Sequence, residues 1–168
     1  MAADNHSPLA NNSPLAIRVL STFRELRRDA LDLHTFFEIA GGNVPSQREA
    51  VLDAVTNLVQ HGLLRERGGD FYSLTESGRL ALAGPRDLTL LGRPGCHLCE
   101  EARTIVAPMA AKFGLLFGEI NTDEDARLRE RYGTDVPVLF LGSQEIARHS
   151  VDAGRLRDRL AAIPQVSQ

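Results

Sequence analysis

The chain has 168 residues, of which 43% are hydrophobic and 24% charged, a balance typical of one large or two small globular domains. Its formal net charge of −3 argues against a strongly basic surface for nucleic acid or membranes. No apolar run approaches the roughly 18 residues of a membrane span, and the N-terminus lacks the layout of a signal peptide, so we expect a cytoplasmic protein without membrane contact.

The first predicted elements are a tail and a helix. Residues 1–13 are polar and lack hydrophobic periodicity, which predicts a disordered tail. From Pro14 onwards apolar residues recur at helical spacing, and Ser13 is the expected N-cap. The apolar face of this helix comprises Leu15, Val19, Leu20, Phe23 and Leu26.

Two further helices follow along the chain. The first covers 33–40, with Asp32 as its cap and a glycine pair beginning at Gly41 as its end. The second is longer, with Ser46 as the expected cap and Gly62 as its end.

A β-hairpin and a short helix complete the first half. Two strands at 63–66 and 71–74 flank a turn with the sequence Arg-Gly-Gly-Asp. Thr75 is the expected cap of a last helix that runs to Ala83.

Three helices followed by a two-stranded wing resemble a winged helix-turn-helix domain, and the phrases at 59–64 and 72–79 are similar to the hairpin region of bacterial winged-helix regulators. We therefore predict a small α+β winged-helix-like domain over residues 14–84. The resemblance implies DNA binding, a protein contact or dimerisation through this domain.

The charge of this half favours a protein contact over DNA. Residues 1–84 contain eight arginines and ten acidic side chains, a net charge of −2. The third helix, which enters the major groove in winged-helix proteins that bind DNA, carries one cation, Arg48, against Glu49 and Asp53. Because phosphate contacts dominate nonspecific DNA affinity, we interpret the domain as a protein-contact or packing module.

The only two cysteines of the chain, Cys96 and Cys99, follow an apolar strand at 87–91 and a glycine-bounded turn at 92–95. Cys96 lies where a helix begins, so its sulfur faces free backbone N–H groups and the positive end of the helix dipole. Such a position lowers a cysteine pKa from about 8.5 to between about 3.5 and 7.5. We expect Cys96 to be the nucleophile and Cys99, one helical turn further on, to resolve a mixed disulfide.

The second half continues as alternating elements. Asp123 is the expected cap of its second helix. Besides the strand at 87–91, the predicted elements are a helix at 97–113, a strand at 115–120, a helix at 123–132, strands at 136–141 and 145–148, and a helix at 152–163.

This order of elements resembles the minimal thioredoxin fold and, within it, the glutaredoxin-like branch. The resemblance also rests on the sequences at 91–100 and 142–149, and on Pro137, which lies 41 positions after Cys96. The resemblance covers 86–163 and implies an α/β domain at 85–164, with a four-stranded mixed sheet flanked by helices.

The resemblance also implies a substrate site. It makes the Val136–Pro137 bond cis and places it across from the cysteines, where the Val136 backbone pairs with an extended thiol substrate. Arg93 matches the family position whose cation holds a glutathione carboxylate. Glutathione is therefore one expected co-substrate, and a protein disulfide is the other.

Several alternatives remain at this stage. His97 either tunes Cys96 or is solvated. Zinc requires four ligands and no second cysteine pair exists, so we expect no metal, and no cofactor beyond a thiol reductant.

The leading hypothesis is a thiol-disulfide oxidoreductase. The alternative is a redox-responsive regulator in which the state of Cys96 and Cys99 switches the winged helix on DNA or on a partner.

Overall fold

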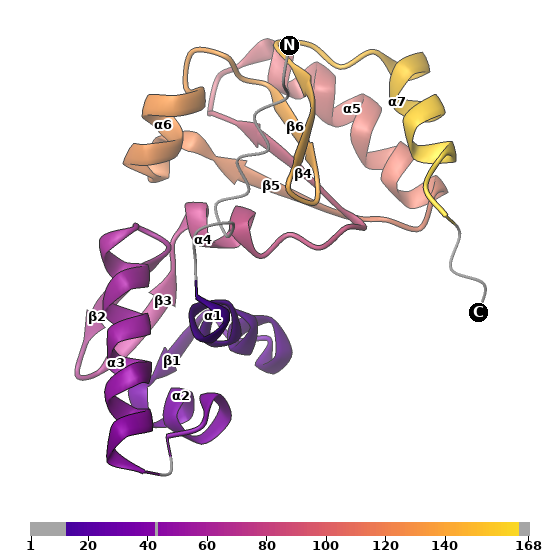
Figure 1. Cartoon of the computed structure of the whole chain (residues 1–168). Coiled ribbons are helices and arrows are strands. Elements are labelled where there is room, and N and C mark those ends of the chain that lie inside the picture. The colour runs from indigo at the N-terminus through magenta and orange to yellow at the C-terminus, as the bar shows by residue number, and fades with distance from the viewer. Residues whose placement is uncertain (1–12, 43, 165–168) are drawn as a thin grey trace. The chain divides into compact units, whose positions relative to one another are not determined.

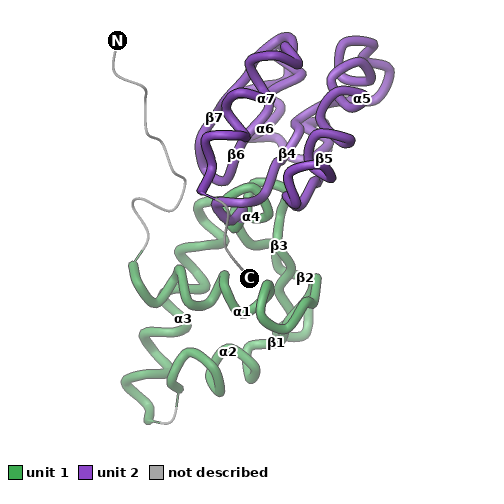
Figure 2. The backbone as a smooth tube through the Cα atoms, turned by 90° about the vertical axis from the view of Figure 1, so that its right-hand side faces the viewer, with its two compact units in different colours: residues 1–82 green, residues 83–168 purple. Residues whose placement is uncertain are grey.

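The computed structural model describes residues 13–42 and 44–164, and the chain divides into two compact units, Met1–Leu82 and Ala83–Gln168 (Figures 1 and 2). We call these unit 1 and unit 2. The predicted tail at 1–13 lies outside the described residues, apart from Ser13. Within the described part of the chain, no helix combines the length and the apolar character that crossing a membrane requires.

In its described residues, unit 1 comprises four helices and a three-stranded antiparallel sheet in the order β1-β3-β2. Its elements are α1 (Pro14–Leu26), β1 (Ala30–Asp32), α2 (Leu33–Ala40), α3 (Pro45–Gln60), β2 (Leu64–Gly68), β3 (Phe71–Leu74) and α4 (Glu76–Ala81).

Three of these helices begin as the sequence predicts, each at a side-chain oxygen that accepts a hydrogen bond from a free backbone N–H. The donor–acceptor distances are 3.2 Å from Ala16 N to Ser13 Oγ, 2.9 Å from Thr35 N to Asp32 Oδ1 and 3.0 Å from Gly78 N to Thr75 Oγ1.

Two features of unit 1 differ from the sequence prediction. Ser46 is not a cap, because α3 begins one residue earlier at Pro45 and its N-cap, Val44, makes no side-chain cap bond. Proline suits this first position, since its fixed φ is helical and its missing N–H would have had no partner. The prediction also lacked β1, a three-residue strand that pairs with β3.

The core of unit 1 lies between α1, α2, α3 and the sheet. Phe36 on α2 is fully buried and contacts two other rings, Phe23 at 5.6 Å and Tyr72 at 6.1 Å between centroids. The tilted geometry of both pairs is the arrangement that aromatic rings favour. The Phe36 side chain of α2 thereby connects α1, through Phe23, with β3, through Tyr72.

Unit 2 contains a four-stranded mixed sheet in the order β5-β4-β6-β7, in which β4 is parallel to β5 and antiparallel to β6, and β6 is antiparallel to β7. Its elements are β4 (Asp87–Gly92), α5 (His97–Lys112), β5 (Leu116–Asn121), the 3-10 turn η1 (Thr122–Glu124), α6 (Ala126–Tyr132), β6 (Val138–Leu141), β7 (Gln144–Arg148) and α7 (Ala153–Ala161).

Helices cover both faces of this sheet, with α5 and α7 together on one side and α6 on the other (Figure 1). Leu88 and Leu90 of β4 pack in one cluster with residues of α5 and α7, as expected from the two-residue period of a strand. Phe140 of β6 instead meets Tyr132 of α6 edge to face at 5.7 Å. The unit is a mixed α/β domain consistent with a thioredoxin-like fold.

One helix start in unit 2 was predicted wrongly. Asp123 lies in η1, and the cap of α6 is Asp125, whose carboxylate accepts from Arg127 N at 3.0 Å and Leu128 N at 3.2 Å. Asn121 Oδ1 accepts from Asp123 N at 3.0 Å, so a separate turn precedes the helix. Asp152 caps α7 as predicted, accepting from Arg155 N at 2.7 Å.

Candidate redox site

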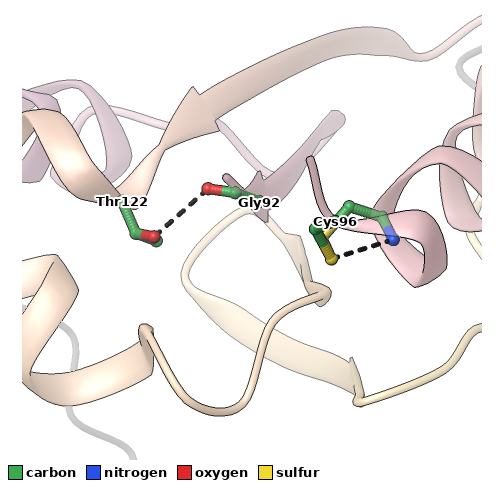
Figure 3. Close-up of a disulfide and its surroundings, with 4 residues drawn as sticks. Gly92, Cys96 and Thr122 are labelled. Atoms are coloured by element: carbon green, nitrogen blue, oxygen red, sulfur yellow. Dashed lines mark hydrogen bonds between the residues drawn. A yellow bond between two sulfur atoms is a disulfide. The ribbon is translucent and has the colours of Figure 1, made fainter. Parts of the chain in front are cut away.

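Cys96 is the N-cap of α5, and its sulfur accepts a hydrogen bond from Cys99 N at 3.2 Å (Figure 3). The two cysteines form a disulfide, with their Cα atoms 5.2 Å apart. The sulfur therefore occupies the position of a capping oxygen and faces the free N–H groups at the helix start, as the sequence predicts.

The two sulfurs differ in their access to solvent. Cys99 is 5% exposed, whereas Cys96 is half-buried. In the reduced form a thiolate at Cys96 would face the positive end of the helix dipole, and a thiol at Cys99 would be shielded by the protein. An incoming disulfide can thus reach the sulfur that is better disposed to ionise.

Gly92 and Thr122 fix the end of β4 behind the disulfide (Figure 3). A Cβ atom at Gly92 would lie 3.3 Å from Cys99 Cβ and 3.4 Å from its Sγ, so glycine lets the strand approach Cys99 closely. The fully buried Thr122 donates its hydroxyl to Gly92 O at 3.2 Å. Sequence reasoning missed Thr122. The only signal in the sequence is that Thr122 follows the predicted strand at 115–120, whereas its partner Gly92 is set by the pairing of β5 with β4.

Val136 and Pro137 are both buried, and the peptide bond between them is cis. The strand begins at Val138 rather than at Val136, and Val138 pairs with Leu91 of β4. This register brings Pro137 to the end of the sheet at which β4 ends and the turn before the cysteines begins.

Asp135, directly before Val136, belongs to an ion-pair cluster. The guanidinium of Arg148 donates to the Asp135 carboxylate and, through two bonds of 2.8 Å, to the Glu145 carboxylate. Hydrogen bonding to Glu145 is the main cause that raises the pKa of Arg148 above the usual value for arginine. The segment before the cis proline is thereby tied to β7.

Arg93 is exposed and lines a pocket of about 270 Å³ on the β5 side of the cysteine pair, together with Cys99. Arg103 and Glu119, which form an ion pair, also line it. The structure therefore places the predicted carboxylate-binding cation beside the site.

His97 turns along the surface of α5. Its Nε2 lies 3.0 Å from Glu101 Oε1, one turn further along the helix, and its side chain is 82% exposed. The imidazole of His97 therefore contacts a carboxylate of its own helix.

Within residues 13–42 and 44–164, no group of three or more His, Cys, Asp or Glu side chains is arranged to hold a metal ion.

The cysteine pair and the mixed sheet define a thiol-containing redox domain. Residues 87–161 match the family described as the glutaredoxin-like domain (DUF836), and this part of the chain is a glutaredoxin-like domain of that family. The predicted resemblance over 86–163 is confirmed for these residues. The family and the disulfide between Cys96 and Cys99 together indicate a redox function.

Two solved structures similar to this chain are those of a Northeast Structural Genomics target protein, XcR50, from X. campestris. The X-ray structure is 42% identical, covers 46% of this chain and 99% of that chain, and has a TM-score of 0.38. The solution structure is 39% identical, covers 47% of this chain and 97% of that chain, and has a TM-score of 0.39.

Proposed function

We propose that the protein is a thiol-disulfide oxidoreductase of the glutaredoxin-like type. The observation that carries this proposal is the arrangement of the two sulfurs, in which a half-buried Cys96 caps α5 and is disulfide-bonded to a buried Cys99. A structural disulfide of the same spacing would not require its outer sulfur at a helix start, where thiolate is favoured.

The reaction is a two-electron exchange. The Cys96 thiolate attacks one sulfur of a substrate disulfide, which forms a mixed disulfide and releases the other substrate sulfur as a thiolate. Cys99, deprotonated to solvent, then attacks Cys96 Sγ, so that the Cys96–Cys99 disulfide forms and the second substrate thiolate leaves. The substrate is reduced and the cysteine pair oxidised. A thiol reductant such as glutathione returns the pair to the dithiol, and no metal or organic cofactor takes part.

Three residues are proposed to hold the substrate. The backbone of Val136, presented by the cis bond to Pro137, pairs with the substrate strand-fashion. Arg93 binds a substrate carboxylate, for which the fork of a guanidinium is well suited. The exchange suits a reducing compartment, and we propose the cytoplasm.

Trapping tests this proposal. Reduced Cys99→Ser protein, offered oxidised glutathione or a disulfide-bonded peptide, should accumulate a stable mixed disulfide at Cys96 that mass spectrometry detects. Cys96→Ser protein should reduce the same substrates no faster than buffer does. A Cys96→Ser variant that keeps the wild-type rate would exclude the mechanism.

For unit 1 we propose a winged-helix module that contacts proteins, including a second copy of the chain. Its order of helices and strands and its three-stranded sheet support this. Arg48, the one cation of α3, donates to Gly42 O at 2.9 Å and lies over the Phe37 ring at 5.5 Å, so it is engaged within the unit rather than free for phosphate.

The second candidate function is a redox-responsive regulator, and the presence of a second compact unit in the same chain favours it. The oxidised and the reduced protein should then differ in their affinity for DNA or for a captured partner protein. Equal affinities in titrations of the two forms would dismiss it.

A further inference from the structure

A groove of about 540 Å³ is lined by residues of β7, which is an edge strand of the unit 2 sheet, of α7 and of the segment that joins them. Its apolar part is formed by the half-buried Ile146 and Val151 and the buried Leu156. Its charged rim is formed by Arg148, Asp152, Arg155, Asp158 and Arg159. An apolar floor with a charged rim is typical of a binding groove.

Two of the five rim charges, those of Arg148 and Asp158, are already paired with other charged side chains. Arg148 is occupied by Asp135 and Glu145. Asp158 lies 3.4 Å from the guanidinium of Arg157, which is outside the groove.

Two cations remain on the rim. Within the described residues, the guanidinium groups of Arg155 and Arg159 have no ion-pair or hydrogen-bond partner, and both side chains are exposed. The nearby carboxylate of Asp152 accepts the backbone N–H of Arg155 as the cap of α7. Arg155 and Arg159 are four residues apart on one helix and so lie on the same face, one above the other. The rim therefore favours an anionic ligand.

The groove begins close to the segment that presents the cis proline. Arg148 lines the groove and binds the Asp135 carboxylate, while His149 N donates to Asp135 O at 3.2 Å. Asp135 directly precedes Val136, so a peptide paired with Val136 can continue over β7 towards α7.

We propose that this groove binds an acidic segment of a protein substrate next to its disulfide, an inference that rests on the function proposed above. An aliphatic side chain of the segment lies on the floor, and its carboxylates pair with Arg155 and Arg159. Arg159 is seven residues past the Asp152 cap, which is roughly 10 Å along the helix. Since an extended residue spans about 3.3 Å, a segment that follows α7 from its cap to Arg159 needs about three residues, whereas glutathione has a single residue on either side of its cysteine. The arrangement therefore fits a longer acidic peptide.

The test compares disulfide-bonded peptides with the full chain. Two peptides of equal length carry the same disulfide, one followed by glutamates and the other by glutamines, and oxidised glutathione is the third substrate. Each is mixed with reduced protein, and formation of the Cys96–Cys99 disulfide is followed by thiol alkylation and mass spectrometry. The variants are Arg155→Gln with Arg159→Gln, and the matched control Arg157→Gln on the same helix.

Wild-type protein should react about three- to tenfold faster with the glutamate peptide than with the glutamine peptide, the range expected for two exposed ion pairs. The preference should weaken as salt is added. The double variant should lose the preference and keep its rate with glutathione, whereas Arg157→Gln should keep both.

The outcomes separate this inference from the proposed function. No disulfide formation in wild-type protein with any substrate would overturn the oxidoreductase proposal itself. Exchange at equal rates with both peptides, or a preference that survives in the double variant, would overturn only the groove. Equal loss of preference in Arg157→Gln would also overturn it, because the effect would then follow the net charge of α7.

Discussion

In unit 1, α1, α2 and α4 begin at side-chain oxygens from Ser13, Asp32 and Thr75, whereas α5 of unit 2 begins at the sulfur of Cys96. An oxygen cap contributes about 1 kcal/mol to stability. Sulfur is a weaker acceptor, but it can be oxidised, and the same free N–H groups that a cap satisfies also stabilise a thiolate. The comparison shows that the same helix-start geometry holds an oxygen cap in unit 1 and, at α5 of unit 2, a sulfur of the disulfide.

The largest effect should come from the unit 1 core. Phe36→Ala removes the ring that joins Phe23 to Tyr72 and should destabilise unit 1 by about 3–5 kcal/mol. The chain has two tyrosines, one in each unit, so ring NMR signals of Tyr72 and Tyr132 report the two unfolding transitions separately in urea. The disulfide exchange of unit 2 should be unchanged. A parallel shift of both transitions would show that the two units unfold together.

The next largest effect tests the hydrogen bond between Thr122 and Gly92 near the disulfide. Thr122→Val removes the hydroxyl that binds Gly92 O and leaves the carbonyl of the half-buried Gly92 without this partner, at a cost of about 1–3 kcal/mol to unit 2. Closure of the Cys96–Cys99 disulfide should slow as well, because the Gly92 backbone approaches Cys99 closely. Urea denaturation and the rate of oxidation measure the two effects.

Thr104→Val is the matched control for that variant, since the Thr104 hydroxyl donates to Glu101 O on the exposed side of α5. Thr104→Val should change the free energy of unfolding of unit 2 by no more than a few tenths of a kcal/mol, and the rate of disulfide closure by no more than the corresponding factor. Equal effects of the two variants would remove the special role of Thr122.

A smaller effect separates the two roles of Cys96. Under reducing conditions, Cys96→Ser keeps a capping acceptor and Cys96→Ala does not, so the alanine variant should be less stable by about 1 kcal/mol in urea denaturation. Both variants should lose disulfide exchange. Equal stabilities would mean that this position contributes no cap.

The smallest effect concerns Asp32. The hydrogen bonds from Thr35, first from its side chain and then from its backbone, lower the pKa of the Asp32 carboxyl below 3.8. A lowered folded-state pKa adds stability that is complete above the unfolded-state value and disappears as the pH falls through the folded-state value. Asp32→Asn keeps an acceptor, so it should cost only a few tenths of a kcal/mol near pH 7. Its difference from wild type should shrink as the pH falls below 3.8 and vanish below the folded-state pKa in urea titrations, and a difference independent of pH would contradict the assignment.

Much of the local structure could be predicted from the sequence. The caps at Ser13, Asp32 and Thr75 and the position of Cys96 at a helix start follow from short-range patterns. A cap and the N–H that it binds lie two or three residues apart, so both are visible in one window of sequence. Ser46 and Asp123 are the exceptions, because both have side chains suited to capping but do not cap the helix. The N-cap of α3 is Val44 and that of α6 is Asp125.

The sequence alone located the cysteine pair and determined where most residues stand in their own elements, because hydrophobic periodicity and capping are local properties. The tertiary structure alone decided which side chains meet. It brought Thr122 to Gly92, Arg148 to Asp135 and β1 to β3, contacts that join distant parts of the chain. Among the residues that the structure describes, it also left the guanidinium groups of Arg155 and Arg159, which line the groove, without an ion-pair partner. Pairings of this kind depend on strand order and packing, which no single stretch of the sequence specifies.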